Sequence, residues 1–153
     1  DRGAAFADEV AALCARHPEW EAEIRAFDTG WGNMVPGAIE PNMRLLERLL
    51  GKGEPIYAIT NFSREKWAEA RERFPVLQRF EGVVVSAHER LIKPDPAIYR
   101  TLLDRYGLEA GRCLFIDDSE KNVDAARAVG MRALHCPLGF DLEAGLRDAG
   151  VAV

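Results

Sequence analysis

The sequence has no stretch of about 18 uncharged apolar residues, the length that a membrane-spanning helix needs. Its first residues, 1–5, also lack the apolar core of a signal peptide. There is no basic surplus, since Lys and Arg number 20 against 25 Asp and Glu, for a formal net charge of −5. We therefore expect a cytoplasmic protein with no membrane partner and no nucleic-acid partner.

Cysteine and histidine are both scarce, with three residues of each. Cys14, Cys113 and Cys136 are widely separated and form no Cys-x-x-Cys pair, so neither a disulfide framework nor a zinc site is indicated. Buried, inert thiols are the simplest interpretation, and they fit a reducing compartment. None of the three histidines has metal-ligand spacing, and we interpret them as incidental.

Apolar residues are plentiful, at 48% of 153 residues, which is enough for one domain with a sizeable core. From residue 36 onward, apolar stripes at helical spacing alternate with four short apolar runs. These runs predict strands at 56–59, 83–85, 113–116 and 132–135. Strands that are apolar throughout, with helices between them, indicate an α/β fold with a doubly wound parallel sheet covered on both faces.

Helix boundaries are marked by several capping residues. Ser63 and Ser119 stand where an N-cap is expected, and Asp95 precedes a proline at the first helical position. Gly107 and Gly130 are placed to end helices. Residues 1–35 differ from the rest, because two amphipathic stripes follow each other with no strand between them, the second running from Trp20 to Trp31.

Polar side chains stand after three of the four expected strands, at the edge where ligands bind in such sheets. They are Thr60 and Asn61, then Ser86, then Asp117 and Asp118, with Lys93 following the second strand. Two adjacent carboxylates repel each other unless a cation relieves them, and carboxylate oxygens suit Mg²⁺. The positive charge of a lysine side chain is suited to binding a phosphate group. Together these side chains predict a site for a metal ion and a phosphate ester.

Each motif also has a purely structural interpretation. Asp117, Asp118 and Ser119 could simply begin a helix, where negative charge is favourable. Lys93-Pro94-Asp95-Pro96 could be only a turn and a helix start, and Asn61 could be only a turn residue. Their occurrence together, at successive strand ends, favours the functional interpretation.

Three segments carry a resemblance to a known family: Ile-Tyr-Ala-Ile-Thr-Asn-Phe-Ser (56–63), Leu-Ile-Lys-Pro-Asp-Pro-Ala-Ile-Tyr (91–99) and Leu-Phe-Ile-Asp-Asp-Ser-Glu-Lys-Asn-Val-Asp-Ala-Ala-Arg-Ala-Val-Gly-Met (114–131). They resemble the second, third and fourth motifs of the haloacid dehalogenase (HAD) superfamily, in the same order. The resemblance covers about residues 36 to 136. It implies a Rossmann-like core over 36–153, with 1–35 as the C-terminal part of a small helical cap.

The resemblance also implies a function. The capped phosphatases of this superfamily hydrolyse small phosphomonoesters with Mg²⁺, through an aspartyl-phosphate intermediate. A small phosphorylated metabolite is the expected substrate, and a monomer or a homodimer is the expected state.

Roles for individual residues follow from the same resemblance. Thr60 is expected to bind the phosphoryl group, with Asn61 near the substrate. Lys93 is the catalytic residue that neutralises the phosphate and the nucleophile. Asp118 is the direct Mg²⁺ ligand and catalytic residue, and Asp117 is its partner. The supporting residues of this loop are Ser119 and Asn122.

One departure from the family is large. No apolar strand ending in the nucleophilic Asp stands in residues 1–35, and Asp28 is rejected because it follows a helical stripe. We expect this strand upstream of Asp1, lying in the sheet between the strands at 56–59 and 113–116. Residues 1–153 alone are therefore expected to be inactive and not to form a stable monomer.

Two alternatives stay open. A 2-haloacid dehalogenase-type hydrolase would need no metal, so paired acids favour the phosphatases over it. The second alternative is an inactive module that kept the fold, or one half of a fused enzyme. A receiver domain is rejected, because there the acid pair comes at the first strand and the lysine last, whereas here Lys93 precedes Asp117.

Overall fold

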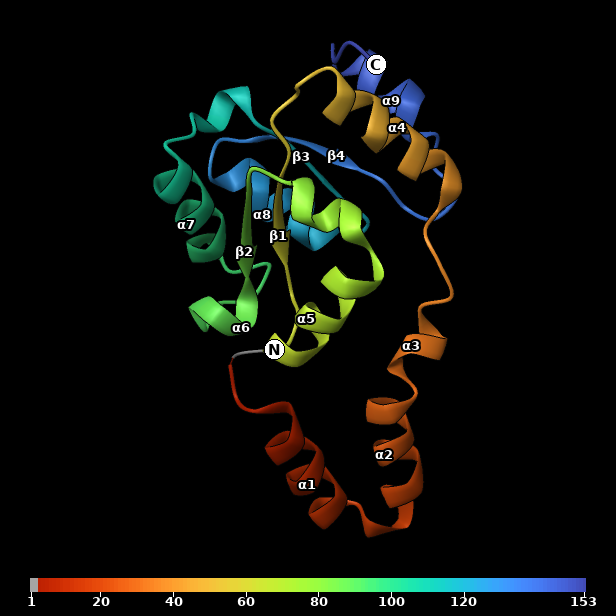
Figure 1. The fold of residues 1–153 in the computed structure, drawn as a ribbon. Coiled ribbons are helices and arrows are strands. Elements are labelled where there is room, and N and C mark those ends of the chain that lie inside the picture. Colours follow the sequence, from red (N-terminus) through yellow and green to blue (C-terminus); the bar gives the residue numbers. More distant parts are fainter. Residues whose placement is uncertain (1–2) are drawn as a thin grey trace.

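The computed structural model describes residues 3–153, which form a helical hairpin and an α/β core (Figure 1). The hairpin consists of α1 (Phe6–Arg16), a 3₁₀ turn (Pro18–Trp20), α2 (Glu21–Thr29) and α3 (Trp31–Met34). The sequence predicts two helices here. The second stripe is interrupted, because α2 ends at Thr29 and Gly30 closes it by donating to the Ala26 carbonyl.

The core alternates helices and strands as expected, and all four strands form within one residue of the predicted bounds. Its elements are α4 (Glu40–Gly51), β1 (Tyr57–Thr60), α5 (Arg64–Arg73), β2 (Gly82–Val85), α6 (Ser86–Glu89), α7 (Pro96–Tyr106), β3 (Leu114–Asp117), α8 (Glu120–Ala128), β4 (Arg132–His135) and α9 (Leu142–Asp148). Short 3₁₀ turns precede β2 and β3. No helix in residues 3–153 is long and apolar enough to cross a membrane.

The strands form two separate parallel pairs. β1 pairs with β2, Thr60 lying opposite Val85, and β3 pairs with β4, Asp117 lying opposite His135. Within residues 3–153, β1 and β3 are not hydrogen-bonded to each other, as the family topology predicts. The Ile116 side chain of β3 is 38% exposed, whereas the other three residues of this strand are half-buried. The facing edges of β1 and β3 are therefore both open.

Helices α7 and α8 hold the two strand pairs together. One cluster of buried side chains draws on β1, β2, α7 and α8, with Phe115 of β3 packed against it. The cluster consists of Ile59, Val84, Ile98, Tyr99, Leu102, Ala126 and Met131. The core thus fixes the relative position of the two strand pairs without a ladder between them.

Helix ends follow the sequence signals closely, with one exception. The Ser63 hydroxyl accepts from the Lys66 amide at 3.1 Å, and the Asp95 carboxylate accepts from the Ala97 amide at 2.9 Å. Gly107 ends α7 at a φ of 62°, a conformation that glycine adopts without strain. Ser119 is the N-cap residue of α8, as predicted, but its side chain makes no capping hydrogen bond.

Cysteine burial matches the expectation only in part. Cys14 is buried, whereas Cys113 and Cys136 are half-buried, and all three are free thiols.

The helical hairpin lies beyond the carboxyl ends of β1 and β2, and α4 and α9 lie at the opposite end of the molecule (Figure 1). The edge that carries the expected site residues therefore faces the hairpin.

Candidate functional site

Asn61 clamps the backbone of Lys93. Its Oδ1 accepts from the Lys93 amide at 2.9 Å, and its Nδ2 donates to the Lys93 carbonyl at 3.1 Å. Both backbone polar groups of one residue are thus held by a single amide side chain. The loop after β1 and the loop before α7 are thereby joined, which brings two of the sequence motifs together.

The Lys93 ammonium lies against Asp117 at the end of β3. Nζ donates to Oδ2 at 2.7 Å, and the two side chains are only 12% and 6% exposed. The Phe115 ring centroid lies 5.6 Å from the same ammonium. Burial alone would raise the pKa of Asp117. Hydrogen bonds from Lys93, Asn122 and the Ser119 amide outweigh it, so the pKa lies below its ordinary value and the carboxylate is charged.

The second oxygen of Asp117 organises the loop that follows. Oδ1 accepts from the Ser119 amide and from Asn122 Nδ2, both at 2.9 Å. This explains why Ser119 does not cap α8 with its hydroxyl: the start of the helix is held by Asp117 instead. Tyr99, which is fully buried, donates its hydroxyl to the Asn122 carbonyl at 3.0 Å. In the sequence Tyr99 belongs to one of the motifs, but no spacing rule points to this contact.

Asp118 differs from its neighbour because its side chain is exposed. Within residues 3–153 no hydrogen bond reaches its carboxylate, whereas its backbone carbonyl lies 2.9 Å from His135 Nε2. The interpretation of His135 as incidental therefore needs correction, because this side chain contacts the loop of the paired acids. The signal that could have found it is its position at the end of β4, opposite Asp117 in the register.

Thr60 is the last residue of β1, and within residues 3–153 no hydrogen bond joins it to Lys93. It lines a hollow of about 330 Å³ beside β1, together with Trp31 and Val35 of the hairpin side and Ala58 and Phe62 of the core. Within the described chain its hydroxyl forms no hydrogen bond, so this polar group is available at the open edge of β1.

Ser86 has a structural role. It is fully buried, and its hydroxyl accepts from the Phe62 amide at 3.0 Å and donates to the Phe62 carbonyl at 3.1 Å. It thus holds the loop after Thr60 to the end of β2. Both hydrogen bonds of the Ser86 hydroxyl are thus made to the backbone of one residue.

Replacing Ser86 by alanine is expected to lower the free energy of unfolding by about 1–3 kcal/mol, because both backbone groups of Phe62 lose their partner. Urea denaturation measures this loss. Ser119→Ala is the matched control and should change stability by less than about 0.5 kcal/mol. Equal effects of the two substitutions would contradict the role given to Ser86.

The donors present fit Mg²⁺, although they do not form a complete metal cluster. Within the part of the chain that the structure describes, no three His, Cys, Asp or Glu side chains come together. Mg²⁺ is usually held by only one or two carboxylates, the remaining positions being water and phosphate oxygens. An exposed Asp118 carboxylate beside the charged Asp117 supplies those oxygens at the strand end.

Several known proteins are similar to this chain. The family described as "Hydrolase: haloacid dehalogenase-like hydrolase" matches residues 4–130. The sesquiterpene phosphatase astK of Aspergillus oryzae is 36% identical over 102 residues, which is 65% of this chain and 52% of the relative. A phosphoglycolate phosphatase of Aliivibrio fischeri is 29% identical over 96 residues, 63% of this chain and 42% of the relative. The chain spans about half the length of these relatives.

Solved structures show the same fold. The HAD family enzyme bt-2542 of Bacteroides thetaiotaomicron, as a magnesium complex, is 26% identical with a TM-score of 0.63. The match covers 71% of this chain and 57% of that chain. A mutant of that enzyme, in complex with magnesium and inorganic phosphate, is 25% identical, with the same TM-score and with 71% and 58% coverage.

Proposed function

Because the chain belongs to the haloacid dehalogenase-like hydrolase family, we propose that it is part of a Mg²⁺-dependent phosphatase of small phosphomonoesters. The observation that carries the proposal is the buried Lys93–Asp117 pair at the open edge between β1 and β3, with Thr60 and Asp118 at the same edge. A charged lysine held in place by Asn61 and Asp117 is a ready partner for a phosphate group.

The nucleophile in this proposal is an aspartate at the end of a further parallel strand, which precedes Asp1 in the chain and lies between β1 and β3. Two open strand edges and the exposed Ile116 support this placement. Such a strand would pair the free backbone groups of both edges, each of which costs about 1–3 kcal/mol when buried without a partner. It would also complete the active site.

The reaction then has two displacements at phosphorus. An oxygen of the aspartate carboxylate attacks phosphorus and the bond from phosphorus to the ester oxygen breaks. The leaving oxygen takes a proton from a water molecule, and the hydroxide left behind takes up the proton that the second step releases. Water next attacks phosphorus, releases inorganic phosphate and restores the carboxylate. Lys93 and the Thr60 hydroxyl hold the phosphoryl oxygens during both displacements, and this positioning supplies most of the rate enhancement in phosphoryl transfer.

Asp118 would hold Mg²⁺ directly and Asp117 through a water molecule. When bound, the ion supplies positive charge that lowers the repulsion between the nucleophile and the phosphate. Asn122 and the Ser119 amide keep Asp117 charged and oriented for this role.

In the same proposal, residues 1–35 are the C-terminal part of a helical cap over the site, and 36–153 are the core.

The relatives support a small phosphorylated metabolite as substrate, since one is a sesquiterpene phosphatase and another a phosphoglycolate phosphatase. We expect a protein that includes the preceding strand to release phosphate from p-nitrophenyl phosphate with Mg²⁺ and to lose this activity with EDTA. Hydrolysis of 2-chloropropionate instead of phosphate esters, or activity that persists in EDTA, would overturn the proposal.

A further inference from the structure

Lys66 stands out because one ammonium group contacts all three helices of the hairpin. It lies on the first turn of α5, and its side chain is only 12% exposed. Nζ donates to the Asp28 carbonyl at 2.8 Å and lies 2.9 Å from Asp28 Oδ1. The same atom lies over the Phe6 ring at 5.2 Å and over the Trp31 ring at 6.0 Å. These partners come from α2, α1 and α3 respectively.

The aromatic partners of Lys66 continue in both directions. Phe6 stacks on Phe27 at 6.4 Å, which joins α1 to α2. Trp31 meets the edge of Phe62 at 5.9 Å, and Phe62 is the second residue after Thr60. A continuous set of contacts therefore runs from the hairpin, through Lys66 and Trp31, to the loop that carries the phosphate-binding groups.

The charge of Lys66 is well compensated. Burial lowers its pKa, but hydrogen bonds to Asp28 and to Glu69, whose Oε2 lies 3.3 Å away, outweigh burial and leave the pKa raised. A lysine paired in this way is charged at neutral pH, and a partly desolvated ammonium over an aromatic ring is further stabilised by the cation–π interaction. Moving the hairpin away from α5 would break these contacts, which favours the docked arrangement.

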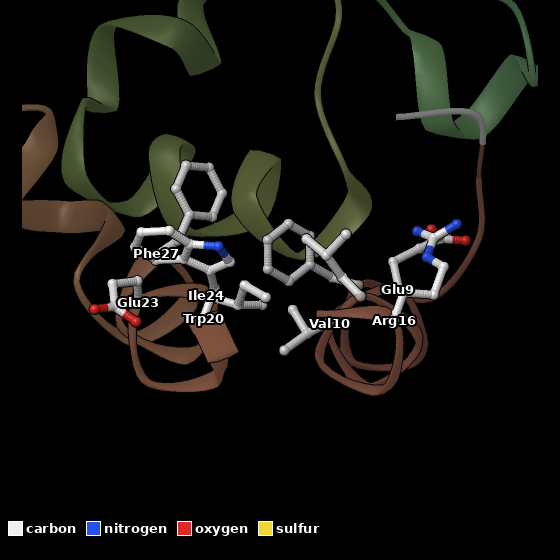
Figure 2. A pocket seen from close by; sticks show the side chains of 9 residues that line it. Glu9, Val10, Arg16, Trp20, Glu23, Ile24 and Phe27 are labelled. Carbon is white, nitrogen blue, oxygen red and sulfur yellow. The ribbon is translucent and has the colours of Figure 1, made fainter. Parts of the chain in front are cut away.

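Apart from Lys66 and Trp31, the hydrogen bonds between the hairpin and the core are exposed. The Phe6 amide donates to Glu65 at 3.2 Å, and Arg73 donates to the Gly32 carbonyl. Within residues 3–35 of the described chain, Cys14 is the single buried side chain, and an open apolar groove lies between α1 and α2, lined by Val10, Ile24 and others (Figure 2). The hairpin's own packing therefore does little to fix it. Its position depends on Lys66, together with Trp31, which packs against the buried cluster of Trp67, Ala70 and Val85.

On the basis of the function proposed above, we propose that Lys66 is a positioning residue that holds the α1–α3 hairpin over the carboxyl edge of the sheet. Lys66 thereby sets how tightly the leaving group of the phosphate ester is enclosed. Lys66 does not reach the phosphoryl group, because its ammonium is occupied by Asp28 and Glu69. Its effect is on substrate affinity, exerted through Trp31 and Phe62.

Kinetics of Lys66→Met, in a protein that includes the preceding strand, tests this proposal. The KM for p-nitrophenyl phosphate should rise about tenfold while kcat changes less than about threefold, because ground-state enclosure is lost and the chemical step is not. The inhibition constant of inorganic phosphate, which has no leaving group, should stay within about twofold. Lys66→Arg should restore the KM, since it keeps the charge and the aromatic contacts.

Arg71→Met is the matched control, because it removes an exposed positive charge from the same helix. Hydrogen exchange gives a second readout: amides of α1–α3 should exchange about tenfold faster in Lys66→Met, with those of α7 and α8 unchanged. An unchanged KM together with unchanged exchange overturns the role of Lys66. If the parent protein hydrolyses no phosphate ester, the proposed function fails, and the exchange measurement still decides whether Lys66 anchors the hairpin.

Discussion

Replacing Asp118 by asparagine is expected to reduce phosphatase turnover about a thousandfold, the upper end of what removal of one preorganised charged group costs. The substitution keeps the shape of an exposed side chain, which makes no hydrogen bond within residues 3–153, so the fold should be unaffected. What is lost is the carboxylate proposed to hold Mg²⁺. Steady-state phosphate release at saturating substrate measures the effect.

Calorimetric titration with Mg²⁺ separates metal binding from catalysis. The affinity should fall by at least about tenfold in Asp118→Asn, as expected for loss of a charged ligand. Asp124→Asn is the control, since it removes an exposed carboxylate of α8 that pairs with Arg127 at 3.0 Å. Equal Mg²⁺ affinity in Asp118→Asn and the parent protein would remove Asp118 from the metal site.

Lys93→Met is expected to lower kcat/KM by roughly a hundredfold or more, the loss typical of removing one electrostatic group aimed at the transition state. The lysine is held by three features: the Asn61 side chain bonded to its backbone, the Asp117 ion pair and the Phe115 ring. A change of less than about threefold would show that the segment is only a turn and helix start.

Stability must be followed in the same variant, because Lys93→Met leaves the nearly buried Asp117 carboxylate without its ion-pair partner. Breaking such a pair typically costs about 3–5 kcal/mol. Kinetics are therefore compared at a temperature where denaturation curves show both proteins folded. Lys121→Met, an exposed lysine on α8, is the control and should leave the activity within about twofold of the parent protein, as expected for a surface charge.

The fold is largely predictable because each element obeys a strong local rule. The strands are continuous apolar runs, and Ser63, Asp95 and Gly107 cap their helices as such residues usually do. The separation of β1 from β3 follows from the family topology rather than from any local pattern. The position of the hairpin over the carboxyl edge is implied by the resemblance, but its anchor at Lys66 has no signal in the sequence.

The site is predictable at the level of residue types and not at the level of contacts. Spacing alone places Lys93, Asp117 and Asp118 at one edge, and the structure brings Lys93 directly against Asp117. Sequence spacing cannot show that Asn61 holds the lysine backbone or that Tyr99 supports Asn122, because these bonds join segments 23 or more residues apart. Such contacts depend on the register of the folded strands, which a single sequence does not encode locally.

An experimental structure of a chain that includes the residues before Asp1 tests the central claim most directly. The account predicts a parallel strand between β1 and β3, hydrogen-bonded to both. It should end in an aspartate whose carboxylate lies beside Thr60, Lys93 and Asp118. Ile116 should be buried in that structure, instead of 38% exposed. A structure in which β1 and β3 are hydrogen-bonded directly to each other, with no strand between them, would contradict both the proposed nucleophile and the proposed site.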